Sequence, residues 1–115
     1  MRILSAAPAI GKVPGSAEFA ARYTAKYGPI NNYAASSYDS ARIVMAAVEA
    51  AAAAKRAIPT RAEVLAAMKA TRFQGIAYAA PAQWNPKGDN VAAVIFVNVV
   101  EDGRFKEIDE IAGEP

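Results

Sequence analysis

The segment Tyr33-Ala34-Ala35-Ser36-Ser37-Tyr38 combines residue types that suit a binding site for a small anion. It opens the longest expected helix, and the free N–H groups and positive field of a helix N-terminus attract anions such as a carboxylate. Small Ala35 and Ser36 would let a ligand approach closely, and the ring of Tyr33 or Tyr38 could cover its side chain. We therefore predict Tyr33, Ala35, Ser36 and Tyr38 as ligand-binding residues. The alternative is ordinary capping by a serine of this segment, with Tyr38 in the core.

The chain offers little for catalysis. It contains no Cys and no His. Disulfides, the usual zinc ligand sets and the Ser-His and Cys-His catalytic pairs are therefore excluded. Asp39 is expected on a helix surface, where it can pair with Arg42, and Asp109-Glu110 are expected in a loose acidic tail. No convergent pair of carboxylates remains, so we predict a protein that is not an enzyme and carries no metal or other cofactor.

Two further features suit structural roles. Trp84 is interpreted as a packing anchor beside a turn rather than as a stacking platform for a ligand. Lys87-Gly88-Asp89 is interpreted as a tight turn, because a single Gly without a following helix does not make a phosphate loop. Neither feature is expected to bind a ligand.

The charge pattern argues against nucleic acid as a partner. The formal net charge is +2, and the basic residues are scattered, with only Lys55-Arg56 adjacent. Binding to nucleic acid needs clustered Lys and Arg to neutralise phosphates. No apolar run reaches about 18 residues without a charge, so no membrane span is expected. Met1–Ala9 has a short apolar stretch broken by Pro8 and is interpreted as a strand and exit turn rather than a secretion signal.

Apolar periodicity and turn residues predict three helices and a few strands. The first helix is expected to be capped by Ser16 and to end at Gly28-Pro29. The second runs from Tyr33 or Ser36 to Lys55, and a Thr60-Arg61-Ala62-Glu63 capping box begins the third, which ends near Ala70. Strands are expected over Ile3–Ala7, Val91–Val100 and Arg104–Ile108, with a hairpin turn at Asp102-Gly103. The segment from Ile76 to Trp84 is expected to be irregular, with a short edge strand as the alternative.

Larger apolar residues must supply most of the core, because Ala dominates the apolar fraction of 54% and buries little area per residue. Phe19, Tyr23 and Tyr27 share one helical face and are expected in the core. Tyr38, Ala41, Met45, Val48 and Ala52 follow a 3-4-3-4 spacing along one side of the second helix, and Met45 and Val48 are expected in the core. The predicted fold class is α/β, and the few, distant strands indicate a slice of a larger sheet, with residues 1–115 forming one partial domain.

The motifs also follow a family pattern. In order, they are Tyr23-Thr24-Ala25-Lys26-Tyr27-Gly28, Tyr33–Ala41, Met68-Lys69-Ala70-Thr71, Phe73-Gln74-Gly75, Trp84 with Lys87-Gly88-Asp89, and Val100–Phe105. This series, which covers nearly the whole chain, resembles the C-terminal third of periplasmic solute-binding proteins of the branched-chain amino-acid transport type. The resemblance implies part of a two-lobed type I fold in which crossing strands join the lobes and a cleft holds the ligand.

The resemblance also implies a function and partners. Such proteins deliver amino acids or related small molecules to the permease of an ABC importer, which implies a periplasmic location and places Tyr33–Tyr38 at the cleft. The chain lacks what would precede the last third, including the first-lobe loops that grip the ligand. A ligand-sensing domain of a regulator or receptor with the same fold is the alternative. Because a partial sheet exposes strand edges and apolar surface, we also predict a homo-oligomer, with domain swapping as one route.

Overall fold

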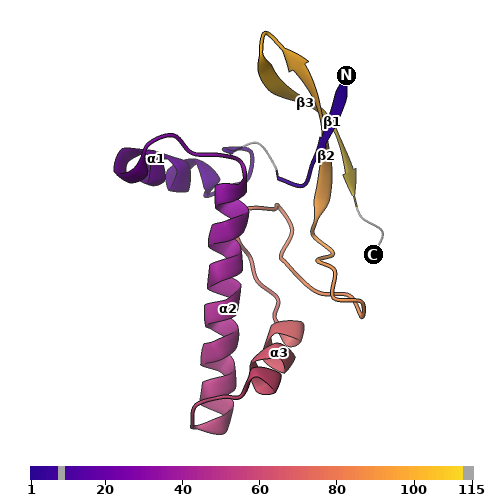
Figure 1. Cartoon of the computed structure of the whole chain (residues 1–115). Coiled ribbons are helices and arrows are strands. Elements are labelled where there is room, and N and C mark those ends of the chain that lie inside the picture. Colours follow the sequence, from indigo (N-terminus) through magenta and orange to yellow (C-terminus); the bar gives the residue numbers. More distant parts are fainter. Residues whose placement is uncertain (8–9, 113–115) are drawn as a thin grey trace.

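The computed structural model describes residues 1–7 and 10–112. Within them the chain forms a three-stranded antiparallel sheet and three helices (Figure 1). The elements are β1 (Arg2–Ser5), α1 (Ser16–Tyr27), α2 (Tyr33–Lys55), α3 (Arg61–Ala70), β2 (Val94–Glu101) and β3 (Arg104–Ala112). The predicted α/β class is confirmed. The turn expected at Pro8 and the last residues of the tail, 113–115, lie outside the described residues.

The sheet has the order β1-β2-β3, and the helices are inserted between β1 and β2. Asp102 and Gly103 form the expected hairpin turn, with φ angles of 50° and 72°. Two successive left-handed residues give the turn the twist that antiparallel strands need. β2 starts at Val94 rather than Val91, because the Asn90 side chain accepts the Ala92 N–H at 3.0 Å and holds a turn there.

The prediction that Asp109 and Glu110 belong to a loose tail is wrong. β3 continues to Ala112, and Val97 pairs with Asp109 while Phe96 pairs with Glu110. A register shift at Val97/Asn98 leaves one additional β3 residue there, so the strand bends without losing its pairing. The acidic residues are therefore held on an edge strand, where charge discourages pairing with other strands.

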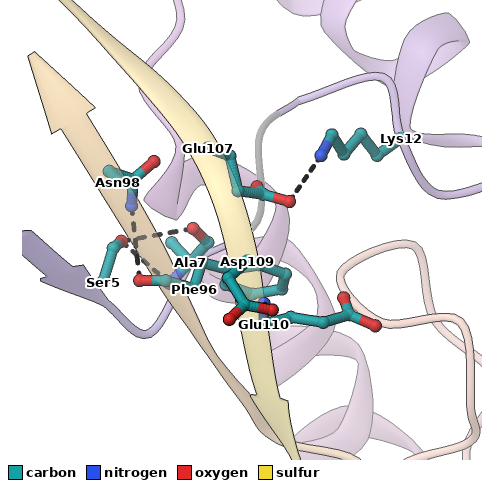
Figure 2. Close-up of polar contacts among 8 residues, drawn as sticks. All are labelled: Ser5, Ala7, Lys12, Phe96, Asn98, Glu107, Asp109 and Glu110. Atoms are coloured by element: carbon teal, nitrogen blue, oxygen red, sulfur yellow. Dashed lines mark hydrogen bonds and ion pairs between the residues drawn. The ribbon is translucent and has the colours of Figure 1, made fainter.

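Polar contacts connect the sheet to the chain that leaves it. Figure 2 shows Lys12 reaching across to Glu107 of β3, and Ser5 hydrogen-bonding with Ala7 where β1 ends. Asn98 donates to the carbonyl of Phe96 at 3.3 Å. The Ser5–Ala7 contacts fix the exit from β1 beside Phe96, which pairs with Ser5 and is buried.

α1 spans the predicted residues, but its start differs from the prediction. Gly15 is the N-cap, and Ser16 lies inside the helix with no capping hydrogen bond. The Ser16 hydroxyl instead donates to Val13 O at 2.7 Å and accepts the Gly11 N–H at 3.0 Å. Ser16 therefore fixes the preceding connector against the helix, which accounts for its burial.

The aromatic face of α1 is not in the core, so that prediction is wrong. Phe19 and Tyr23 are half-buried, and Tyr27 is 65% exposed. Their rings contact one another along the helix, with centroids 5.9 Å and 5.2 Å apart, and Phe19 also packs against Tyr38 at 4.8 Å. The spacing predicted the shared face correctly, but within the described residues only the start of α2 packs on it.

The buried face of α2 is also different from the one expected. Its buried residues recur every four positions, and they are Ala35, Asp39, Ile43, Ala47 and Ala51. The larger side chains of the predicted stripe face outward, with Met45 57% and Val48 40% exposed. Small residues on the buried face let neighbouring backbone approach closely, which explains why alanine rather than Met or Val lies inside.

α3 begins with the predicted capping box and packs along the second half of α2 (Figure 1). The Thr60 N–H donates to the Glu63 carboxylate at 2.6 Å, and Lys55 of α2 donates to the same carboxylate at 3.0 Å. These contacts lower the pKa of Glu63 from 4.5 to about 2, with the backbone hydrogen bond from Thr60 as the largest cause. One carboxylate thus joins the start of α3 to the end of α2.

The molecule is extended for its size. Its radius of gyration is 16.4 Å, whereas a compact domain of this length has about 13 Å. Its accessible surface is 8062 Å², against roughly 6,000 Å² expected for a folded monomer of this mass. In the described part of the chain, no helix is long and apolar enough to cross a bilayer. The excess surface shows that large faces of these elements have no partner within residues 1–7 and 10–112.

Candidate ligand-binding site

The N-terminus of α2 borders a groove between the helix and the sheet. The chain enters α2 through Asn31, whose carboxamide oxygen accepts the Tyr33 N–H at 3.0 Å and whose backbone carbonyl accepts the Ala34 N–H at 3.2 Å. The groove has a volume of about 460 Å³, and its lining residues are Ile3, Leu4, Ser5, Asn31, Asn32, Tyr33, Asn98 and Phe105. This volume lies within the range of small-molecule sites.

Apolar and amide groups share the lining of this groove. Ile3, Tyr33 and Phe105 offer apolar surface, while Asn32 and Asn98 offer side-chain amides. The positive end of the α2 dipole lies beside them. The groove can therefore accept a small molecule with one apolar part and one polar or anionic part.

The four predicted site residues do not converge on one pocket. Tyr33 lines the groove beside the sheet and also a second groove of about 610 Å³ along α1. Tyr38 lines only the α1 groove, and Ser36 lines a small cavity of about 160 Å³. Ala35 is buried. Tyr33 is therefore the one member of the set that lines the groove between helix and sheet.

Sequence reasoning did not identify Tyr78 as a neighbour of this region. The Tyr78 hydroxyl donates to Ala6 O at 3.0 Å and so links the irregular segment after α3 to the exit of β1. Burial raises the pKa of Tyr78, the nearby Ser36 hydroxyl opposes this, and Asp39 and Tyr33 add to the increase. No local sequence pattern marks Tyr78, because its partner Ala6 is 72 residues away in the sequence.

Asp39 is not the surface carboxylate that the sequence predicted. It is buried, and its Oδ2 accepts the backbone N–H groups of Ile76 and Ala77 at 2.8 Å and 2.7 Å. A Cβ at Gly75 would overlap this carboxylate, so only glycine fits there. Arg42 instead lies over the Phe73 and Tyr38 rings, 5.2 Å and 5.6 Å from their centroids. Asp39 therefore positions the segment after α3 against α2.

The small cavity beside Asp39 is bounded by α2 and by residues 73–90. Ser36, Asp39 and Trp84 line it, and each has a buried polar atom, Oγ, Oδ1 and Nε1 respectively, that finds no hydrogen-bond partner among the described residues. Trp84 pairs with Asn90 next to the predicted turn, in which Asn85 Oδ1 accepts the N–H groups of Lys87 and Asp89. The turn prediction for Lys87-Gly88-Asp89 is confirmed.

The titratable groups do not form a metal centre. Among residues 1–7 and 10–112, no group of three or more Asp, Glu, Cys or His side chains is arranged to hold a metal ion. The grooves at the start of α2 remain the candidate ligand site because the predicted residues Tyr33 and Tyr38 line them.

Comparison with known proteins agrees with this description. The described residues form a partial α/β lobe with a groove beside the start of α2. The family model described as "Periplasmic binding protein" matches residues 5–104. The chain therefore belongs to the periplasmic binding protein family, and the predicted resemblance is confirmed.

The fold is also similar to a solved structure. That structure is the leucine binding protein LivK from Thermotoga maritima MSB8, with a TM-score of 0.74 and 22% sequence identity. The match covers 97% of this chain and 31% of the other, so this chain spans about a third of that protein's length. A search of curated proteins finds no match.

Proposed function

We propose that this chain is part of a periplasmic receptor for amino acids or related small molecules, which delivers them to the permease of an ABC importer. The observation that carries the proposal is the groove beside the start of α2 in a chain of the periplasmic binding protein family. The leucine-binding structure with the same fold makes an aliphatic amino acid the first ligand to test. The role requires binding and release without catalysis.

The groove offers complementary groups to such a ligand. A carboxylate would lie at the positive end of the α2 dipole, near the Asn32 and Asn98 amides. An aliphatic side chain would pack on Tyr33, Ile3 and Phe105. Asn31 already occupies the Tyr33 and Ala34 N–H groups, so the dipole and the side-chain amides contribute most of the recognition.

Residues 1–115 form one partial domain in this proposal and supply one wall of a cleft. With contacts from one side only, binding of a free amino acid to the isolated chain is expected to be weak. A dissociation constant of about 1 mM corresponds to roughly 4 kcal/mol, a reasonable magnitude for a half-enclosed ligand. The chain is also expected to self-associate.

The test is a titration of isotope-labelled chain with L-leucine, followed by two-dimensional amide NMR. The expected result is saturable movement of the signals of Asn32, Tyr33 and Asn98, with little change in α3. Leucinamide is the matched control, since it keeps the side chain and ammonium but lacks the carboxylate. It is expected to bind at least several-fold more weakly.

Two outcomes would count against the proposal. Equal shifts with leucine and leucinamide would show that the carboxylate is not recognised at the start of α2. Shifts that spread evenly over the chain, or that are absent at millimolar leucine, would show that the groove is not a ligand site. The Tyr33→Ala variant removes one wall of the groove and should weaken leucine binding. Because Tyr33 is 58% exposed, its removal leaves the core intact.

A further inference from the structure

The outward face of α2 carries a regular row of apolar residues. Ala41, Met45, Val48 and Ala52, here called the outer stripe, repeat at intervals of four, three and four residues. This alternation is the heptad spacing that lets one helix pack along another. Met45 is 57% and Val48 40% exposed. The outer stripe is thus patterned for a helical partner that the described chain does not supply.

Neighbouring elements limit where such a partner can lie. α3 packs on the opposite side of α2, where Ala50, Ala51 and Ala54 face Ala66 and Ala67. At the N-terminal end, Phe19 of α1 packs against Tyr38. Figure 1 shows α2 extending well beyond α1, with α3 along one side only. A partner helix therefore has access to the section of α2 from Ala41 to Ala52.

The charges beside the outer stripe indicate the partner. Arg42 and Glu49 are exposed and seven residues apart, so they lie on the same flank of the helix. When two copies of a helix pack antiparallel, the same flanks meet. If Met45 of one copy faces Val48 of the other, Arg42 lies within roughly 3 Å, along the axis, of the position opposite the second copy's Glu49. A parallel pair would bring the opposite flank of the outer stripe, which carries Val44, to these charges and leave them unpaired.

The excess exposed surface of the whole chain is larger than one partner's share of a standard interface. The chain exposes about 2,000 Å² more than a compact monomer of its mass. A standard protein interface buries about 800 Å² on each partner. Ala41 and Ala52 would face one another across the pair, and their small side chains allow the axes to approach within about 8–10 Å.

We propose that two copies of this chain associate through the outer stripe of α2 as an antiparallel, two-fold symmetric helix pair. Met45 packs against Val48 of the other copy on both sides of the axis, and Arg42 pairs reciprocally with Glu49. The association uses a face remote from the ligand groove. Its failure would therefore leave the leucine titration unaffected.

The test is sedimentation equilibrium of the full chain over the micromolar range, without ligand. The expected result is a reversible dimer whose dissociation constant rises about a hundredfold or more in Val48→Glu, because two-fold symmetry buries the new charge twice. Ala21→Glu is the control matched in charge, since Ala21 is exposed on α1 outside the outer stripe. It should leave the dissociation constant within a few-fold. Circular dichroism establishes that each variant keeps its helices.

A charge exchange tests the antiparallel arrangement. Glu49→Arg should weaken the dimer by placing arginines opposite one another, and the double variant Arg42→Glu/Glu49→Arg should recover most of the loss. Because the chain has no cysteine, a mixture of Ala41→Cys and Ala52→Cys chains should cross-link under mild oxidation more efficiently than either chain alone.

Several results would overturn the proposal. A folded chain that stays monomeric throughout the micromolar range would show that another polypeptide or no polypeptide covers the outer stripe. A dimer unaffected by Val48→Glu would place the interface elsewhere. Cross-linking that is strongest within each single-cysteine chain would show a parallel pair.

Discussion

The contact between Asp39 and the backbone at residues 76–77 should be one of the most sensitive points of this fold. Asp39→Ala removes the acceptor of two hydrogen bonds, from Ile76 N–H and Ala77 N–H, at 2.8 Å and 2.7 Å. A hydrogen bond to a charged group contributes about 1.5–3 kcal/mol. We therefore expect Asp39→Ala to lower the free energy of unfolding by about 3–5 kcal/mol. That is a large fraction of the 5–15 kcal/mol typical of a domain.

The Asp39→Asn variant separates the contribution of the carboxylate charge from that of the acceptor oxygen. Asp39→Asn keeps one oxygen for both N–H groups but loses the charge and replaces the buried Oδ1 with an NH2 group, so the expected loss is about 1–2 kcal/mol. Urea unfolding followed by circular dichroism measures both variants. Glu18→Ala is the control, because Glu18 is an exposed carboxylate 3.8 Å from Arg22 and should change stability by less than about 0.5 kcal/mol.

A second substitution tests whether the contact itself is responsible. A Cβ at Gly75 overlaps the Asp39 carboxylate, so Gly75→Ala should be costly in the natural chain and cheaper once Asp39 is alanine. The loss of unfolding free energy in the double variant Asp39→Ala/Gly75→Ala should be smaller than the sum of the two single losses by more than about 1 kcal/mol. The reasoning fails if Asp39→Ala costs no more than Glu18→Ala. If Asp39→Ala does not fold, the Asp39→Asn variant provides the test. Unchanged amide-exchange protection at Ile76 and Ala77 in that variant would refute the stabilising role of the Asp39 charge.

Two further predictions concern α3 and the hairpin. The Glu63 carboxylate, whose pKa is lowered from 4.5 to about 2, stabilises the folded state above pH 4.5, and this contribution is lost as the pH falls toward 2. Glu63→Gln should flatten the dependence of the unfolding free energy on pH between 2 and 4.5, measured by urea unfolding. An unchanged dependence would contradict the role given to Glu63. At the β2–β3 turn, Gly103 has a φ of 72°, so Gly103→Ala should cost about 1 kcal/mol. Thermal unfolding of this variant measures the loss, and a neutral effect would show that the turn relaxes into another form.

Local patterns predicted the elements well, and distant contacts explain where the sequence misled. The α3 capping box and the Asp102-Gly103 turn depend on residues within a few positions of each other, so their signals lie in the sequence itself. The buried face of α2 is decided by what packs there: α3 and the segment at Ile76 approach the alanine side. The role of Asp39 depends on amides 37 and 38 residues away, and no local pattern carries that information.

The candidate site illustrates a second limit. Tyr33, Ala35, Ser36 and Tyr38 were grouped because they are neighbours in sequence, but each helical residue turns by about 100°. Consecutive positions therefore point in different directions. The folded chain buries Ala35 and directs Ser36 to a small cavity, while Tyr33 and Tyr38 share the groove along α1. Asn98 and Phe105, which share a groove with Tyr33, come from strands more than sixty positions away, and only the topology brings them there.

The position of the helices between β1 and β2 constrains the order in which the molecule can assemble. The β2–β3 ribbon forms from adjacent residues, so it can appear early and without help from the rest of the chain. β1 offers only four residues, Arg2–Ser5, to the edge of that ribbon. Its docking must close a loop of roughly ninety residues, an entropic cost of about 4 kcal/mol. Helix packing shortens that loop in advance, so we expect β1 to dock on the sheet after the helices have formed.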